Sequence, residues 1–241
     1  MLGDQKCATI IGIVGDQDVR LRPSDKVLDL GCGSGAVVRA FREAGYDAWG
    51  CDFTPKGELA EAGLIRQISR QPYRLPFGDG EMKLIISTQV FEHVRNTQET
   101  IAEIHRVLKP QGVSLHLFPS RYRLVEGHIK VPMAGVWQSW WWLKLWAALG
   151  VRNRRQKLLS ARETAQRNYE FLHAKTNYLD KRSLLREFSR FFPETRFVED
   201  SFLRHSAKGR KAYYISRAIP FFPYLYGTLK ARVVYSRKSS A

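Results

Sequence analysis

The stretch Val27–Gly35 contains the clearest candidate for a ligand-binding turn, because an apolar run ends in Asp29 and three closely spaced glycines follow. The glycines Gly31, Gly33 and Gly35 permit positive φ and a close approach of the backbone to a ligand. A strand that feeds such a turn and then a helix is how α/β proteins bind nucleotide-like ligands. Since the Asp29 carboxylate would repel phosphate, the turn favours a ligand that carries positive charge.

A second acidic residue, Asp52, ends the apolar segment Asp47–Asp52 that follows in the chain. In dinucleotide-binding folds an acid at the end of the second strand accepts hydrogen bonds from the ribose hydroxyls. A ribose combined with cationic groups is found in S-adenosylmethionine, which carries an ammonium and a sulfonium. The two acids and the glycine turn therefore predict S-adenosylmethionine as the cofactor and S-adenosylhomocysteine as its product.

Candidate acid–base residues follow two later apolar segments. His128 is the preferred general base, because an imidazole titrates near neutral pH, and Glu126 could orient it. His93 follows the apolar segment Lys83–Ser87 and could shape the site of methyl transfer. Structural roles in capping and packing are the alternative for both histidines. The sequence shows no cluster with metal-ligand spacing, and methyl transfer from a sulfonium does not require a metal, so none is expected.

These residues need an alternating strand–helix framework to position them. Apolar segments predict strands at 27–30, 47–52, 83–87, 113–118, 195–201 and 231–237. Amphipathic patterns predict helices at 36–44, 97–108 and around Leu184–Phe188, with Pro110 and Gly112 ending the second of them. Short turns between alternating strands and helices imply a doubly wound parallel sheet.

Four segments in this order resemble the class I S-adenosylmethionine-dependent methyltransferases, and among them the type 11 group that acts on small molecules. The segments are Val27–Gly35, Trp49–Asp52, Leu75–Val94 and Ile104–Gly112. The resemblance covers about residues 25 to 120. It implies an α/β, Rossmann-like sheet of seven strands with an antiparallel last strand. It also implies one domain over residues 1–241, with a helical lid or substrate insertion over 120–180 after the fifth strand.

The resemblance also implies which residues hold the methyl donor. In the family, an Asp four residues before the Leu-Pro-Phe motif receives the adenine amino group, and here that position is Gln71. A glutamine oxygen can accept the same hydrogen bond. The expected donor-binding residues are Asp29, Gly31, Cys32, Gly33, Gly35, Asp52, Phe53, Gln71, Leu75 and Gln89.

Charge and composition limit the class of protein. The formal net charge is +16, and no acidic residue follows Asp200. Basic faces attract nucleic acid, anionic lipid or acidic substrates, and a solvated basic surface is the alternative. Three cysteines without paired spacing favour reduced thiols, and Met1–Gly15 shows no secretory signal. A cytoplasmic protein, peripheral at a membrane surface in one interpretation, is expected.

Five tryptophans lie between residues 137 and 146, within the apolar stretch Ala134–Gly150. The stretch is shorter than the ~20 apolar residues of a membrane span. A lid helix over the active site is the first interpretation. The second is an interfacial helix that, with the basic residues that follow it, places 137–157 on anionic lipid. The third is an aromatic and basic surface for nucleic acid.

The sequence therefore predicts methyl transfer to an O, N or C nucleophile of a small-molecule or lipid- or glycan-linked acceptor. An enzyme that methylates nucleic acid is one alternative, which the basic charge supports. Against it, Ser87–Val90 stands where enzymes that methylate base amino groups have Asn or Asp, two prolines and an aromatic residue. A non-catalytic module that only binds the cofactor is the other alternative. The acceptor itself depends on the insertion and cannot be derived from local motifs.

Overall fold

A seven-stranded sheet forms the centre of the computed structural model, which describes residues 3–207 and 209–240. The strand order is β3-β2-β1-β6-β7-β9-β8. β9 runs antiparallel to both β7 and β8, while β3, β2, β1, β6 and β7 pair in parallel. The expected Rossmann-like sheet is confirmed. The strands are β1 (Lys26–Leu30), β2 (Asp47–Asp52), β3 (Ile65–Gln67), β6 (Met82–Thr88), β7 (Leu108–Pro119), β8 (Glu194–Phe197) and β9 (Ala231–Arg237), and a separate ribbon joins β4 (Ser69–Arg70) to β5 (Tyr73–Arg74).

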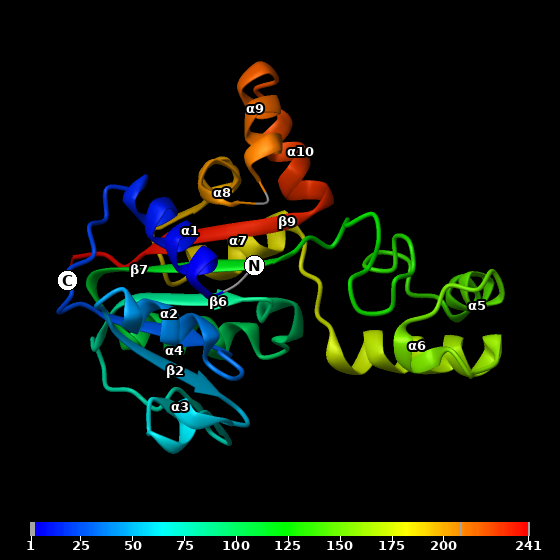
Figure 1. The fold of residues 1–241 in the computed structure, drawn as a ribbon, viewed down its shortest axis with the longest axis horizontal. Coiled ribbons are helices and arrows are strands. Elements are labelled where there is room, and N and C mark those ends of the chain that lie inside the picture. The colour runs from blue at the N-terminus through cyan, green and yellow to red at the C-terminus, as the bar shows by residue number, and fades with distance from the viewer. Residues whose placement is uncertain (1–2, 208, 241) are drawn as a thin grey trace.

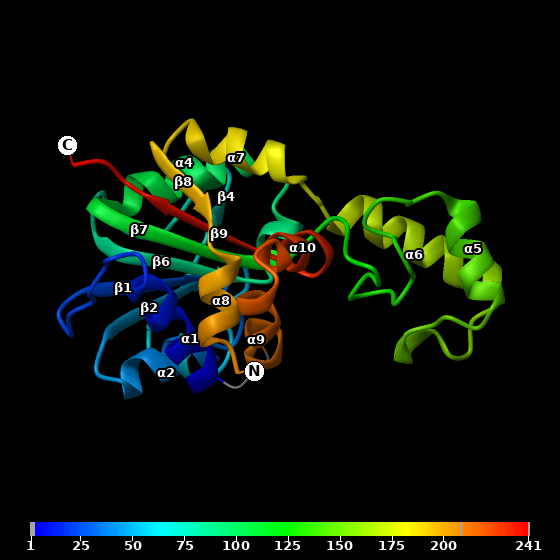
Figure 2. The same cartoon turned by 90° about the horizontal axis from the view of Figure 1, so that it is seen from above.

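Helices cover both faces of this sheet (Figures 1 and 2). α1 (Gly3–Gly15), α2 (Ala36–Glu43) and α8 (Glu199–His205) contribute to the hydrophobic core on one face. α4 (Thr97–Val107) and α7 (Lys181–Ser189) contribute to the core on the other. The remaining helices outside the insertion are α3 (Glu58–Glu61), η1 (Phe91–His93), α9 (Arg210–Ala218) and α10 (Phe222–Leu229).

β6 shows why the sheet is buried on both sides. Its residues Leu84, Ile85 and Ile86 have no exposed surface. Leu84 and Ile86 pack into the core with α1 and α2, whereas Ile85 packs into the core with α4 and α7. A continuous apolar run rather than an alternating one is what a central parallel strand requires.

Two element boundaries differ from the sequence-based expectation. The strand expected at 195–201 ends at Phe197, and helix α8 begins at Glu199. Acidic residues in the first turn, Glu199 and Asp200, favour a helix there because they oppose the positive end of its dipole. The helix expected to run to Leu108 ends at Val107, and Leu108 already pairs with Met82.

Pro110 and Gly112 therefore lie within β7 rather than after a helix. The register between β6 and β7 shifts between Met82 and Leu84, so the chain forms an irregular, bulge-like passage there before regular pairing resumes at Val113. Bulges are sites where a strand tolerates proline and glycine.

The segment between β7 and α7 forms a lobe beyond one end of the sheet (Figures 1 and 2). It contains α5 (Trp140–Ala148), η2 (Arg154–Gln156) and α6 (Ala161–Lys175). This lobe has a hydrophobic cluster of its own, made of Ile129, Val131, Ala134, Leu143, Ala165 and Leu172. Within the described residues, no helix has the length and apolar character needed to cross a membrane.

Candidate active site

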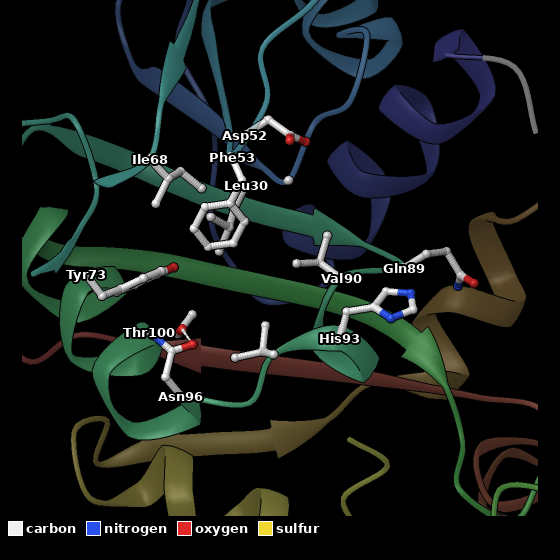
Figure 3. A pocket seen from close by; sticks show the side chains of 12 residues that line it. Leu30, Asp52, Phe53, Ile68, Tyr73, Gln89, Val90, His93, Asn96 and Thr100 are labelled. Carbon is white, nitrogen blue, oxygen red and sulfur yellow. Dashed lines mark hydrogen bonds between the residues drawn. The ribbon is translucent and has the colours of Figure 1, made fainter. Parts of the chain in front are cut away.

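A cavity of about 250 Å³ opens where the parallel strands β1, β2 and β6 end (Figure 3). Ligands of open α/β sheets bind in the crevice outside the carboxyl ends of the strands. The lining includes five residues expected from the sequence, which are Gly31, Asp52, Phe53, Gln89 and His93. It also includes seven that were not expected, which are Leu30, Ile68, Tyr73, Val90, Val94, Asn96 and Thr100.

The glycine turn borders this cavity in the left-handed backbone region. Gly31, Gly33 and Gly35 have φ values of 68°, 57° and 81°. A Cβ on Gly31 would lie 2.6 Å from Val90 Cγ2, so a side chain there would clash. A Cβ on Gly33 would meet nothing within 4 Å, so the backbone at Gly33 faces open space that a ligand can enter.

The Asp52 carboxylate lies beside this turn at the end of β2. Its Oδ2 accepts a hydrogen bond from the Gly33 amide at 3.0 Å, and its Oδ1 accepts one from the Thr54 amide at 3.0 Å. These two hydrogen bonds orient the carboxylate, and Asp52 also lines the cavity. This is the position from which an acid accepts hydrogen bonds from ribose hydroxyls.

Asp29 lies under the turn and does not line the cavity. Its residue is 3% exposed, and burial raises its pKa to about 7, against the attraction of Lys6 and with a smaller contribution from Asp52. Lys6 comes from α1 and donates a hydrogen bond to Thr88 Oγ1 at 3.3 Å. Lys6 could not be identified from the sequence, because α1 precedes every motif that resembles the family.

Besides Asp29, five residues expected to bind the cofactor lie outside the cavity lining, and Gly33 is one of them. Cys32 is half-buried, and Gly35 is the N-cap of α2. Leu75 is buried in the core, and its amide donates a hydrogen bond to Glu103 at 2.8 Å. Gln71 is exposed and precedes Pro72 in a cis peptide bond.

Polar groups that the sequence did not single out lie at the end of the cavity near Tyr73 (Figure 3). Asn96 occupies the N-cap position of α4, and its Oδ1 accepts a hydrogen bond from Thr100 Oγ1 at 3.4 Å. The Phe53 and Tyr73 rings meet edge to face at 6.2 Å. An Asn directly before a helix that follows a buried strand was the signal that could have identified Asn96.

At the other end of the cavity His93 lies next to the pair Glu126–His128. The centroids of the His93 and His128 rings are 5.1 Å apart. His128 Nδ1 lies 2.6 Å from Glu126 Oε1, and the Tyr178 hydroxyl donates to the same oxygen at 2.6 Å. The Ile129 amide donates to Glu126 Oε2 at 2.7 Å. Burial opposes ionisation of Glu126, but these hydrogen bonds outweigh it and lower its pKa to about 2.

The hydrogen bonds of the two histidines fix which nitrogen carries the proton. His93 Nδ1 lies 2.6 Å from the Lys175 carbonyl oxygen, which can only accept, so Nδ1 donates. His128 Nδ1 likewise donates to the ionised Glu126. In the neutral rings Nε2 is then the free acceptor. The Glu126 hydrogen bond also raises the pKa of His128 above its ordinary value, against the effect of burial.

Glu92 adds a buried carboxylate to this cluster. Neither of its side-chain oxygens has a hydrogen-bond partner, and burial raises its pKa to about 7. One ligand atom each from Glu92, His93 and His128 lies within 4.8 Å of the others. Imidazole and carboxylate are ligands of divalent transition metals, so these three residues could hold such an ion. Sequence analysis found no such cluster, because His128 is remote from the other two in the chain.

Comparison with known proteins bears on the fold and the family. Residues 28–115 match the family profile described as a methyltransferase domain. The chain is 30% identical over 105 residues to an uncharacterised methyltransferase of Synechocystis sp. and 32% identical over 96 residues to the ubiquinone biosynthesis O-methyltransferase of Methylococcus capsulatus. The matches cover 40% and 36% of this chain. They cover 48% and 40% of the relatives, so about half of their length or less is represented.

Solved structures resemble the chain over nearly its whole length. Geranyl diphosphate methyltransferase in complex with S-adenosylmethionine has a TM-score of 0.52 at 16% identity, with coverage of 98% of this chain and 85% of that one. An S-adenosylmethionine-dependent methyltransferase from Mesorhizobium loti has a TM-score of 0.54 at 14% identity, with coverage of 97% and 100%. A [4+2]-cyclase reaches 0.51 at 15% identity, with coverage of 97% and 81%, so this likeness shows the fold and not the reaction.

Proposed function

Because the chain carries a class I S-adenosylmethionine-dependent methyltransferase domain, we propose that it transfers a methyl group from S-adenosylmethionine to an oxygen, nitrogen or carbon nucleophile of a small-molecule or lipid- or glycan-linked acceptor. The observation that carries this proposal is that the oriented Asp52 carboxylate and His93 line one cavity, with the His128 ring next to the His93 ring. Of the two relatives named above, one is described as an O-methyltransferase of ubiquinone biosynthesis and the other as an uncharacterised methyltransferase.

The residues around the glycine turn fit the proposed donor. S-adenosylmethionine, when bound, supplies a methyl group that positive sulfur already activates. Asp52 would accept hydrogen bonds from the ribose hydroxyls. The open space at Gly33 allows the backbone amides to approach the ligand. Asp29, whose pKa of about 7 lies near neutrality, becomes fully ionised when a cationic ammonium binds nearby. Phe53, Tyr73, Asn96 and Thr100 supply an aromatic and polar lining for the adenine.

At the acceptor end His128 serves as the general base in this proposal. Its Nε2 takes the proton of the acceptor as the new bond to the methyl carbon forms, and the bond between carbon and sulfur breaks with its electron pair left on sulfur. Glu126 holds the ring in the required tautomer and stabilises the imidazolium that results. His93 positions the acceptor between the cavity and His128.

Titration with S-adenosylhomocysteine tests the assignment of the donor site. Wild-type protein should bind it in a calorimetric titration, and Asp52→Ala should weaken binding by about tenfold or more, since bonds to a charged group contribute about 1.5–3 kcal/mol. Asp47→Ala, at the opposite end of β2, is the matched control and should bind like the wild type. Absence of heat with the wild type, or equal binding by Asp52→Ala, would refute the donor site.

The exposed face of α5 supports a second proposal, which is peripheral contact with an anionic membrane. Trp141, Leu145 and Leu149 are 73%, 50% and 66% exposed and recur at the helical spacing of four residues. The basic segment Arg152–Lys157 follows directly. None of the tryptophans lines the donor cavity, so the structure supports an outward role for this face better than a lid.

A further inference from the structure

A second and larger cavity of about 800 Å³ lies beside His128, in the lobe that follows β7. Its wall comes from the loop at 128–130, the turn at 152–156 and the helix α6. Within the described residues, no acidic side chain lines it. Its five cationic residues are Lys130, Arg152, Arg154, Arg155 and Arg167.

The positive charges of this cleft form no close ion pairs. In the described part of the chain, no carboxylate lies within the 4.0 Å ion-pair distance of any of the five, whereas Arg39, Arg106, Arg190 and Arg232 each form such a pair. Gathered like charges repel one another, and a bound anion would relieve that repulsion. The arrangement therefore favours a ligand with more than one negative charge.

A buried amide gives the cleft a further donor for an anion. Asn168 has no exposed surface, lines the cleft, and its Nδ2 has no hydrogen-bond partner. Its Oδ1 accepts a bond from Gln156 Nε2 at 2.6 Å, which fixes the side-chain orientation. A buried N–H group without an acceptor is costly, and a ligand oxygen would satisfy it.

Hydrogen bonds also hold the basic turn against α6. Gln156 Oε1 accepts a bond from the Asn153 amide at 3.1 Å, and Asn153 Oδ1 accepts one from the Arg155 amide at 3.0 Å. Asn153 Nδ2 approaches the His128 carbonyl oxygen at 3.5 Å. The cationic turn, the buried amide and the proposed base are thus parts of one hydrogen-bonded unit rather than independent surface groups.

We propose that this cleft binds a phosphate or diphosphate group of the acceptor, which defines the acceptor as a phosphorylated molecule. Four of the five cations are arginines, whose planar guanidinium matches phosphate oxygens in pairs. The volume suits a whole ligand rather than a single ion. This inference rests on the proposed methyl transfer, because His128 both lines the cleft and contacts the His93 ring that borders the donor cavity.

Phe171 gives the organic part of such an acceptor an apolar path. Its ring lies 5.2 Å from the His128 ring and also lines the cleft. With the phosphate held by the arginines, the carbon skeleton would lie over Phe171 and bring its nucleophile to His128. A soluble phosphate ester and a lipid-linked phosphate share this chemistry.

Calorimetric titration of the full chain with inorganic pyrophosphate at constant ionic strength tests the cleft directly. The cleft variant Arg154→Gln/Arg155→Gln/Arg167→Gln should bind pyrophosphate at least tenfold more weakly than the wild type. The control variant Lys157→Gln/Arg162→Gln/Arg182→Gln removes the same charge from residues outside the cleft lining and should bind within twofold of the wild type. Circular dichroism melting of both variants verifies that they fold.

The source of the phosphate is resolved by sedimentation with vesicles of phosphatidylglycerol, compared with phosphatidylcholine. If the cleft variant loses vesicle binding and pyrophosphate competes with the vesicles in the wild type, the cleft accepts a lipid-linked phosphate. If only pyrophosphate binding is lost, the acceptor is soluble. Equal loss of pyrophosphate binding in the cleft and control variants, or no binding by the wild type, overturns the proposal.

Titration with S-adenosylhomocysteine separates this result from the proposed function. Both triple variants should bind it like the wild type, since none of the six residues lines the donor cavity. A wild type that binds pyrophosphate in the cleft but not S-adenosylhomocysteine would refute methyl transfer and leave the anion site standing.

Discussion

Glu126 determines at the residue scale how His128 can act. The structure gives the carboxylate four hydrogen bonds, from the His128 ring and amide, the Ile129 amide and the Tyr178 hydroxyl. It therefore stays ionised through neutral pH, with its pKa near 2. An ionised partner on Nδ1 makes Nε2 more basic and fixes its direction, as in other carboxylate–imidazole pairs.

Glu126→Gln should lower kcat about a hundredfold, within the range that general base catalysis contributes. His128 must be neutral to accept a proton, so kcat/KM rises with pH through its pKa, which Glu126 raises. Without the carboxylate that pKa falls, and the rise should occur at lower pH. Measured pH–rate profiles check this. If the acidic limb of the pH–rate profile lay at the same pH in the variant and the wild type, Glu126 would have only a structural role.

The wild-type enzyme should keep its activity after dialysis against a chelator, because the proposed proton transfer uses His128 and no metal. A loss that Zn²⁺ or Mn²⁺ restores would instead assign Glu92, His93 and His128 to a metal site.

Asp29→Asn should have opposite effects on stability and on binding. Burial raises the pKa of Asp29 from 3.8 to about 7, so the folded state holds more protons than the unfolded state between these values. Stability therefore falls as pH rises through that window. The uncharged amide of the Asp29→Asn variant does not titrate, so this loss of stability does not occur. The variant should therefore melt at a higher temperature than the wild type at pH 8. Its affinity for S-adenosylhomocysteine should fall severalfold, because the attraction between the Asp29 carboxylate and the ammonium of the ligand is lost.

Thermal melting between pH 4 and pH 8, together with calorimetric titration, measures both effects. A variant that is less stable than the wild type at pH 8, or that binds equally well, would contradict the assigned environment of Asp29.

At the scale of elements, α5 is a helix that leaves part of its apolar surface exposed. Its buried side packs Leu143 and Ala147 into the lobe, while Trp141 and Leu145 face outward. Lys144 lies over the Trp140 and Trp141 rings at 5.0 and 5.3 Å, which brings a cation to the same face. Aromatic and basic side chains together are typical of helices that lie in the headgroup region of a bilayer.

Trp141→Ser/Leu145→Ser should reduce sedimentation with phosphatidylglycerol vesicles about tenfold, since both apolar contacts and their burial are lost. Tyr214→Ser/Ile215→Ser on α9 removes similarly exposed apolar groups from another part of the surface and is the matched control. Equal vesicle binding by all three proteins would argue against α5 as the contact.

At the scale of the whole molecule, the sheet and the lobe have separate hydrophobic cores. The lobe cluster around Leu143 and Ala165 shares no residue with the clusters on the two faces of the sheet. The cavity beside Asp52 belongs to the sheet, whereas the arginine-lined cleft belongs to the lobe. The two parts are joined at the site itself, where Asn177 donates through its amide to the Glu92 carbonyl oxygen at 2.6 Å.

Leu143→Ala should therefore open the lobe without unfolding the sheet. Truncation of a buried leucine costs about 2–5 kcal/mol, and Leu143 has no exposed surface. Limited proteolysis should accelerate within 137–160, while the affinity for S-adenosylhomocysteine stays within twofold of the wild type. Leu145→Ala on the exposed side is the control. Proteolysis unchanged, or loss of cofactor binding, would show that the two cores are not independent.

Local pattern was sufficient for the first strand, its glycine turn and the helix that follows. The segment Val27–Gly35 specifies strand, turn and helix through burial and glycine geometry over consecutive residues, and Asp52 follows at the end of the adjacent strand. The boundary of α8 was missed because apolar residues at 195–203 fit a strand as well as a buried helix face. The feature that favours the helix is the pair of acidic residues in its first turn, which is a weaker pattern than the apolar periodicity.

The acceptor half depended on tertiary structure. His93, Glu126 and Tyr178 come from three separate chain segments, and they meet only because the lobe returns to the sheet through 175–178. The orphaned Glu92 carboxylate and the cleft arginines have the same origin, since burial and charge clustering depend on contacts between distant segments. The sequence by itself determined the strand, turn and helix around Val27–Gly35 and the position of Asp52, because consecutive residues encode them. Only the folding of the lobe decided which side chains lie beside His93 and His128, because those side chains come from distant segments.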